Sequence, residues 1–181
     1  MRRLIALLAF VPALVFAQPS PSNPYQPPDE VRPAEEQSLQ LPSFPNDANL
    51  VKVQVEGGLS FEFFVDIESL SLGADGIVRY TLVARSSAGA VNNEYEGIRC
   101  KGRERRLYAV GRADKTWSVV RSSRWTPIAG LPTGRVQATL HDTYFCPAGR
   151  MVRDVAEAKK VLRRGGNPSS SGSSDFWIRN Q

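Results

Sequence analysis

The sequence predicts an α+β fold, in which an antiparallel β-meander of about five to six strands precedes one or two C-terminal helices. Two observations support this prediction. Between residues 51 and 123, short segments rich in Val, Phe and Tyr alternate with turn residues, which is typical of consecutive antiparallel strands. From residue 133 onward, apolar residues recur about every four positions instead, as they do on one side of a helix.

The strands are expected in six segments, each followed by a turn signal or a break in the apolar pattern. The third is the clearest, because Val78, Tyr80 and Leu82 fall on one face. Arg79 and Thr81 fall on the other face of the same strand. The turn before it is predicted from the four residues Gly-Ala-Asp-Gly. The six segments are 51–55, 59–72, 77–86, 94–101, 105–112 and 116–123.

Two helices are considered for the C-terminal part. In residues 133–146, Val136, Leu140 and Tyr144 lie four positions apart, although the segment alternates nearly as well as a strand would. The second helix, in 151–166, is better defined, with apolar residues on one side, arginines in its last turn and Gly165 as its C-cap. Its apolar residues are Met151, Val155, Ala158 and Leu162.

Residues 1–17 have the pattern of a secretory signal peptide. Arg2 and Arg3 precede an apolar run, and small side chains stand before a cleavage site at Gln18. The run is well short of the roughly 20 apolar residues that span a bilayer. The sequence therefore predicts export to the periplasm, with no transmembrane anchor in the mature form.

The mature chain is predicted to contain one folded domain between two flexible segments. Residues 18–49 are rich in Pro, Ser, Gln and Asn and carry five acids against one base, so they are expected to form a disordered acidic arm. Residues 50–164 form the α+β domain, and residues 165–181 are a Gly/Ser-rich flexible tail. The mature charge of about +3 is too small for a dedicated nucleic-acid binder.

Cys100 and Cys146 are the two cysteines of the chain. An even count in an oxidising compartment predicts a disulfide between them. A thiol nucleophile and a metal pair are the alternatives, but two cysteines 46 residues apart and one histidine do not make a zinc site. We expect neither a metal nor another cofactor.

The segment from Arg99 to Arg124 is the most basic part of the chain, with nine Lys or Arg and two acids. Arg99, Lys101, Arg103 and Arg105 share one parity, so several of them are expected to project from one face of a hairpin, where Arg can bind phosphate or carboxylate groups. There are three alternatives. The cations form a solvated face that prevents the edge of the sheet from pairing with another strand, the aromatics belong to the core, or the acidic arm covers the patch. The candidate binding residues are Arg99, Lys101, Arg103, Arg105, Arg106, Tyr108 and Trp117.

The sequence contains no G-x-G-x-x-G, P-loop, H-E-x-x-H or G-x-S-x-G motif, and no residue is assigned a catalytic role. His141-Asp142 resembles a base with an acidic neighbour, but on an α-helix their side chains would point about 100° apart and would not pair. Asp66 and Glu68 are two apart on a predicted strand, so both should face one way, as an acid/base pair, a cation site or a solvated face.

The chain resembles the cryptic neisserial protein (CNP1-like) family of small exported bacterial envelope proteins. The resemblance extends over roughly residues 61–166 and implies an envelope address but no reaction, because the family has no assigned activity. Some members look like lipoproteins, whereas this chain has Gln18 where the lipid-bearing Cys would stand. The matching residues are Tyr95-Glu96-Gly97, Cys100, Arg103, Glu104, Tyr108, Trp117, Tyr144, Cys146-Pro147 and Gly165-Gly166.

The function expected from these observations is a non-enzymatic periplasmic binding or assembly module with a cationic face. Its partner would be an anionic envelope component or an acidic protein surface, and nucleic acid is not expected in that compartment. The alternative is a small hydrolase or transferase that acts on envelope polymers.

Overall fold

A computed structural model describes residues 36–57, 60–129 and 134–166. It confirms the predicted fold class: six strands form an antiparallel meander, and helices follow them. The strands are β1 (Leu50–Val53), β2 (Phe61–Leu72), β3 (Ile77–Ser86), β4 (Val91–Arg99), β5 (Glu104–Gly111), β6 (Trp117–Val119) and β7 (Thr126–Pro127). The helices are α1 (Arg135–Thr139), which continues as a π-helix (Leu140–Phe145), α2 (Val155–Arg163) and two 3-10 turns (Asp47–Asn49 and Pro147–Gly149).

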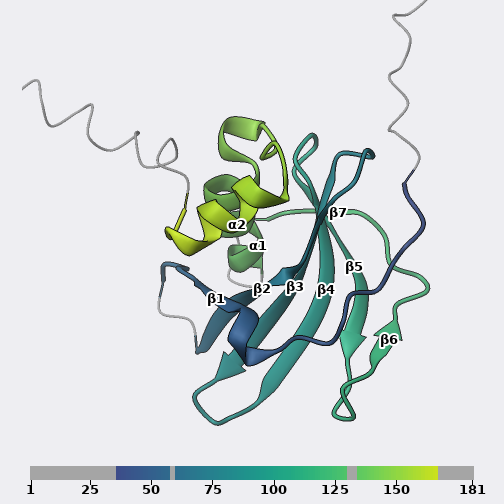
Figure 1. The fold of residues 1–181 in the computed structure, drawn as a ribbon, viewed down its shortest axis with the longest axis vertical. Coiled ribbons are helices and arrows are strands. Elements are labelled where there is room, and N and C mark those ends of the chain that lie inside the picture. The colour runs from purple at the N-terminus through teal and green to yellow at the C-terminus, as the bar shows by residue number, and fades with distance from the viewer. Residues whose placement is uncertain (1–35, 58–59, 130–133, 167–181) are drawn as a thin grey trace, which may run out of the picture. The chain divides into compact units, whose positions relative to one another are not determined.

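The strands pair in sequence order from β1 to β6 (Figure 1). β6 pairs with the C-terminal end of β5, and the short β7 pairs with its N-terminal end. Residue alternation gives the sheet two distinct faces. On β3, Val78, Tyr80 and Leu82 point to one face and belong to the main core, as their spacing predicts. Arg79 and Thr81 point to the other face, and both are also buried.

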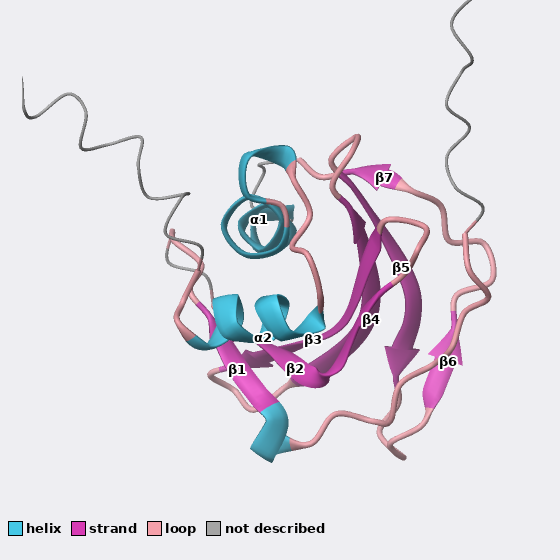
Figure 2. Ribbon diagram, turned by 45° about the horizontal axis from the view of Figure 1, so that its top comes forward, coloured by secondary structure: helices cyan, strands magenta, loops and turns pink. Residues whose placement is uncertain are grey.

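The helices cover the first of these faces, which we call the helix face (Figure 2). Leu140, Tyr144 and Phe145 of the π-helix are fully buried there, and Tyr80 packs its ring against Phe145 at 5.2 Å between centroids. α2 packs on β1 and β2. The helical interpretation of residues 133–146 therefore holds for the described residues from Arg135 onward.

Local side-chain contacts set both ends of α2. The helix begins at Val155, later than Met151, because the carboxylate of Asp154 caps it by accepting from the N–H of Glu157 at 2.7 Å. At the other end, Gly165 and Gly166 have positive φ and donate to Leu162 and Val161, as in a Schellman motif.

A disulfide joins Cys100, just after β4, to Cys146, just after the π-helix. It confirms the predicted pairing and links the sheet to the helices that cover it. Both half-cystines belong to the main core.

Residues 36–49 lie across the sheet face opposite the helices, which we call the arm face (Figure 1, dark blue). The sequence predicted a flexible arm up to Asn49, but this part of it has defined partners. Leu39 packs against the cluster of Tyr95, Tyr108 and Ala109, and Phe44 packs against Trp117. Composition does not predict these contacts, because a few apolar side chains are enough to hold the arm where the sheet offers aromatic rings for them to pack against.

The predicted signal peptide and most of the predicted tail lie outside the described residues. Within the ranges that the structure describes, no helix is long and apolar enough to cross a membrane.

Candidate functional site

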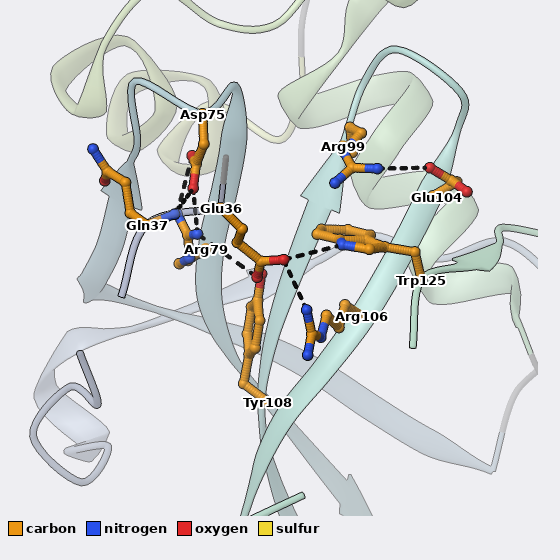
Figure 3. Close-up of polar contacts among 9 residues, drawn as sticks. All are labelled: Glu36, Gln37, Asp75, Arg79, Arg99, Glu104, Arg106, Tyr108 and Trp125. Carbon is orange, nitrogen blue, oxygen red and sulfur yellow. Dashed lines mark hydrogen bonds and ion pairs between the residues drawn. The ribbon is translucent and has the colours of Figure 1, made fainter. Parts of the chain in front are cut away.

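The candidate site lies on the arm face and is centred on the carboxylate of Glu36 (Figure 3). Arg106 of β5 donates from Nη1 to Glu36 Oε2 at 2.7 Å, and the indole Nε1 of Trp125 donates to the same oxygen at 3.2 Å. The hydroxyl of Tyr108 donates to the other oxygen, Oε1, at 2.7 Å. Both oxygens are therefore bound, and the Glu36 side chain retains 23% exposure.

A buried ion pair flanks this carboxylate. Arg79 of β3 donates from both terminal nitrogens to Asp75, at 3.3 and 2.6 Å, and its Nη2 lies 3.9 Å from Glu36 Oε1. The side chain of Asp75 is 0% exposed and that of Arg79 is 6% exposed. Burial alone would raise the pKa of Asp75, but the hydrogen bonds from Arg79 and from the N–H of Gln37 offset it and leave the pKa below its usual value.

Aromatic rings fix the donors in place. The guanidinium of Arg99 lies over the ring of Trp125 at 4.2 Å and pairs with Glu104 at 3.2 Å. Trp125 packs edge-on against Tyr108, at 6.5 Å between centroids. Burial, together with the hydrogen bond to Glu36, raises the pKa of Tyr108, so its hydroxyl remains a donor at neutral pH.

The same face also binds the backbone that follows Glu36. The N–H of Gln37 donates to Asp75 Oδ2 at 2.9 Å, and Trp117 Nε1 donates to the carbonyl of Pro42 at 2.9 Å. The arm face therefore holds residues 36–42 of its own chain through one carboxylate, one N–H and one carbonyl.

Four of the predicted binding residues lie on the arm face: Arg99, Arg106, Tyr108 and Trp117. The prediction that Arg99, Lys101, Arg103 and Arg105 share one face is wrong. The turn after β4 breaks the alternation, because Gly102 and Arg103 both have positive φ. As a result Arg105 stands opposite the buried Ile98, on the helix face. Lys101 is exposed in the turn.

Arg105 joins a polar cluster that the sequence did not reveal. Its Nη1 donates at 2.7 Å to Glu96, which is 0% exposed and also accepts from Tyr80 at 2.8 Å and from Gln137 of α1 at 3.2 Å. Burial and the neighbouring Glu96 raise the pKa of Glu94. Because the oxygens of the buried Glu96 are occupied by donors from three elements, the cluster ties the sheet to α1 and does not face a ligand.

His141 and Asp142 form a contact that the sequence argument excluded, with Nδ1 and Oδ1 2.7 Å apart. The expectation assumed an ideal α-helix, whereas these residues lie in a π-helix, where successive side chains are arranged differently. Asp142 also pairs with Arg103. The other ring nitrogen, Nε2, lies 3.3 Å from the carbonyl of Cys100, so a buried ring is held at both nitrogens and is poorly placed to act as a base.

Asp66 and Glu68 do not face the same way. A shift of register in β2 begins after Asp66, whose carboxylate accepts from the N–H of Glu68 in a local turn. Asp66 is buried, and burial raises its pKa. Glu68 is exposed and pairs with Lys159 of α2. The acid/base and cation-site interpretations of this pair are therefore wrong.

Sequence reasoning did not select Asp75, Arg79 or Trp125 as binding residues, and it considered Glu36 only as part of an acidic arm that covers the basic patch. Asp75 and Arg79 could have been suspected, since an acid and a base four residues apart flank a predicted turn and a buried strand. The alternative that the acidic arm covers the patch agrees with the contact between Glu36 and Arg106, but nothing singled out Glu36 within the arm, which lacks periodicity and lies 70 residues before Arg106.

Comparisons with known proteins identify the family. No curated protein and no solved structure matches the chain. The sequence pattern of the CNP1-like family matches residues 29–163, which include the arm from before Glu36, the whole sheet and both helices. The resemblance seen in the sequence is thereby confirmed, and the chain belongs to the CNP1-like family.

Proposed function

We propose that this protein is a non-enzymatic binding or assembly module of the cell envelope, and that its arm face binds an anionic partner. The observation that supports this proposal is the capture of the Glu36 carboxylate by Arg106, Tyr108 and Trp125. Three donors converge on a carboxylate that comes from a different part of the chain, which is the geometry of a carboxylate receptor.

The chemistry of the site favours binding over reaction. Arg stays charged at any working pH, and a Tyr with a raised pKa does not exchange its proton near neutrality, so neither group is suited to general acid or base catalysis. The donors are instead fixed by aromatic stacking and by the Asp75–Arg79 pair. Fixed cations and hydroxyl donors are suited to holding an anion in one orientation.

The proposed address is the periplasm, reached through a signal peptide cleaved before Gln18. Family membership and the pattern of residues 1–17 are compatible with it. The anionic partners in that compartment would be cell-wall carboxylates, lipid headgroups or acidic protein surfaces. Mass spectrometry of the exported protein should find Gln18 at the N-terminus, and a chain that retains Met1 or carries a lipid would contradict this address.

Binding can be measured with residues 18–181 on two anionic probes, poly-glutamate and phosphatidylglycerol vesicles. Because the attraction is electrostatic, it should weaken between ionic strengths of about 0.1 M and about 1 M, as the Debye length falls from roughly 10 to 3 Å. Arg106→Gln should weaken binding most, since this residue touches the carboxylate directly.

Arg112→Gln is the matched control. It removes the same charge just after β5, where Arg112 is exposed and its one side-chain hydrogen bond among the described residues goes to Ser118. If both variants lose binding equally, the chain responds to net charge alone, and the site around Glu36 has no part in binding.

A further inference from the structure

We propose that the arm face is a peptide-binding site for an extended acidic segment of another protein, and that residues 36–44 of this chain occupy it as a tethered competitor. This inference rests on the proposed function and names the class of its ligand. A partner peptide would displace the arm and place its own carboxylate between Arg106, Tyr108 and Trp125.

The contacts to main-chain atoms favour a peptide over other anions. Asp75 accepts from the N–H of Gln37, and Trp117 donates to the carbonyl of Pro42 (Figure 3 shows the first of these). Any peptide supplies an N–H and a carbonyl at regular spacing, whereas a lipid headgroup supplies neither a backbone N–H nor a repeating carbonyl. Poly-carboxylates without a peptide backbone lack both partners as well.

The apolar contacts define the rest of the pattern. Leu39, three residues after Glu36, packs against the cluster of Tyr95, Tyr108 and Ala109. Phe44, eight residues after Glu36, lies 5.3 Å from the ring of Trp117. The ligand is therefore an extended segment with a carboxylate, an apolar side chain three positions later and an aromatic ring eight positions later.

The arm is held in a way that allows exchange. Among the described residues, no backbone-to-backbone hydrogen bond joins residues 36–45 to the sheet, so the arm is not one of its strands. Side-chain contacts and two single backbone contacts hold it instead. Such an attachment can be released without opening the sheet, since the hydrogen bonds of a strand ladder are not involved.

The groups that flank the three donors keep their partners when the arm leaves. Arg79 remains paired with Asp75, and Arg99 remains paired with Glu104 and stacked on Trp125. A preorganised site loses little when it exchanges one peptide for another. A peptide in trans must still overcome the effective concentration of the tethered arm, which is in the millimolar range for a short flexible connection.

The probe is a fluorescently labelled peptide with the sequence of residues 36–46, EQSLQLPSFPN, and its binding is measured by fluorescence anisotropy. Glu36→Gln weakens the arm by removing its charge, so this variant should bind the peptide about tenfold more tightly than the parent chain does. Leu39→Ala weakens the arm at a different contact and should act in the same direction. A peptide that carries Gln in place of its Glu should bind the Glu36→Gln chain about tenfold more weakly than the original peptide.

Adding Arg106→Gln to the Glu36→Gln chain should abolish the increase in affinity for the peptide. Adding Arg112→Gln should leave that affinity within about twofold. Circular dichroism would establish that each variant keeps its fold. If the peptide binds neither arm variant better than the parent, or binds equally with and without Arg106, the inference is overturned. If phosphatidylglycerol vesicles, which offer no peptide backbone, still bind through Arg106 in that case, the proposed anion-binding function stands and only the peptide ligand is wrong.

Discussion

Asp75→Asn is the sharpest test of how the arm face is built. The change keeps the size of the side chain but removes its charge, and it leaves the guanidinium of Arg79 6% exposed with no carboxylate closer than Glu36 at 3.9 Å. Removing one member of a buried ion pair costs about 3–5 kcal/mol, because the remaining charge is desolvated and unpaired. The N–H of Gln37 keeps an acceptor in the amide oxygen of Asn only if that amide turns toward it.

The assay is equilibrium unfolding in urea, with the parent and the variant compared at the same pH. The double variant Asp75→Asn with Arg79→Met is the matched control, because it also removes the unpaired charge. Its loss of stability should be smaller than the sum of the two single losses. A cost below about 1 kcal/mol for Asp75→Asn, or a double variant that is simply additive, would refute the ion-pair argument.

The same pair predicts how stability depends on pH. The pKa of Asp75 is lower in the folded chain than in the unfolded one, so its contribution is fully present above the unfolded pKa of about 4. The contribution is lost as the pH falls through the lower, folded pKa. The parent should therefore lose its advantage over Asp75→Asn in acid, which urea unfolding at a series of pH values would measure.

Three further predictions concern the scaffold. Replacing both Cys100 and Cys146 by Ser should lower the free energy of unfolding in urea by about 4 kcal/mol, since the bridge closes a loop with a separation of 46 residues; a loss within about 1 kcal/mol would contradict this. His141→Ala should leave the binding of poly-glutamate unchanged, because the ring contacts Asp142 and the Cys100 carbonyl; a folded variant that no longer binds would place His141 at the ligand. Asp154→Ala should cost about 1 kcal/mol in thermal unfolding by removing the cap of α2, whereas Asp154→Asn should cost less.

The strands could be predicted because their signal is local. Alternation along Ile77–Ser86 depends only on neighbours in the sequence, and the observed β3 has these same bounds. The apolar spacing begins at Met151, but α2 begins at Val155, because the carboxylate of Asp154 caps the helix at that point. β7 has only two residues, too few for a period, and it was not predicted.

The site could be predicted only in part, because its defining contacts join distant segments. Tyr108 and Trp117 were selected as candidates from their position near the basic segment, and both contact the arm. The alternation of side chains between the two sheet faces does not continue across the turn at Gly102 and Arg103. Positive φ at these two successive residues interrupts the extended backbone on which the alternation depends. Nothing within the basic segment could indicate that Glu36 lies against Arg106.

The charge of the basic segment shows why a local count misleads. The nine cations and two acids between Arg99 and Arg124 suggest a broad positive surface. In the folded chain, Arg103, Arg105 and Arg106 pair with Asp142, Glu96 and Glu36, three carboxylates from outside that segment. Two of these pairs serve the fold, because Glu96 lies buried against α1 and Asp142 extends from the π-helix beside the disulfide. Arg106 differs from the other two, because its carboxylate comes from the arm, which at Glu36 is neither a strand nor a helix, and our proposal places the competing partner there.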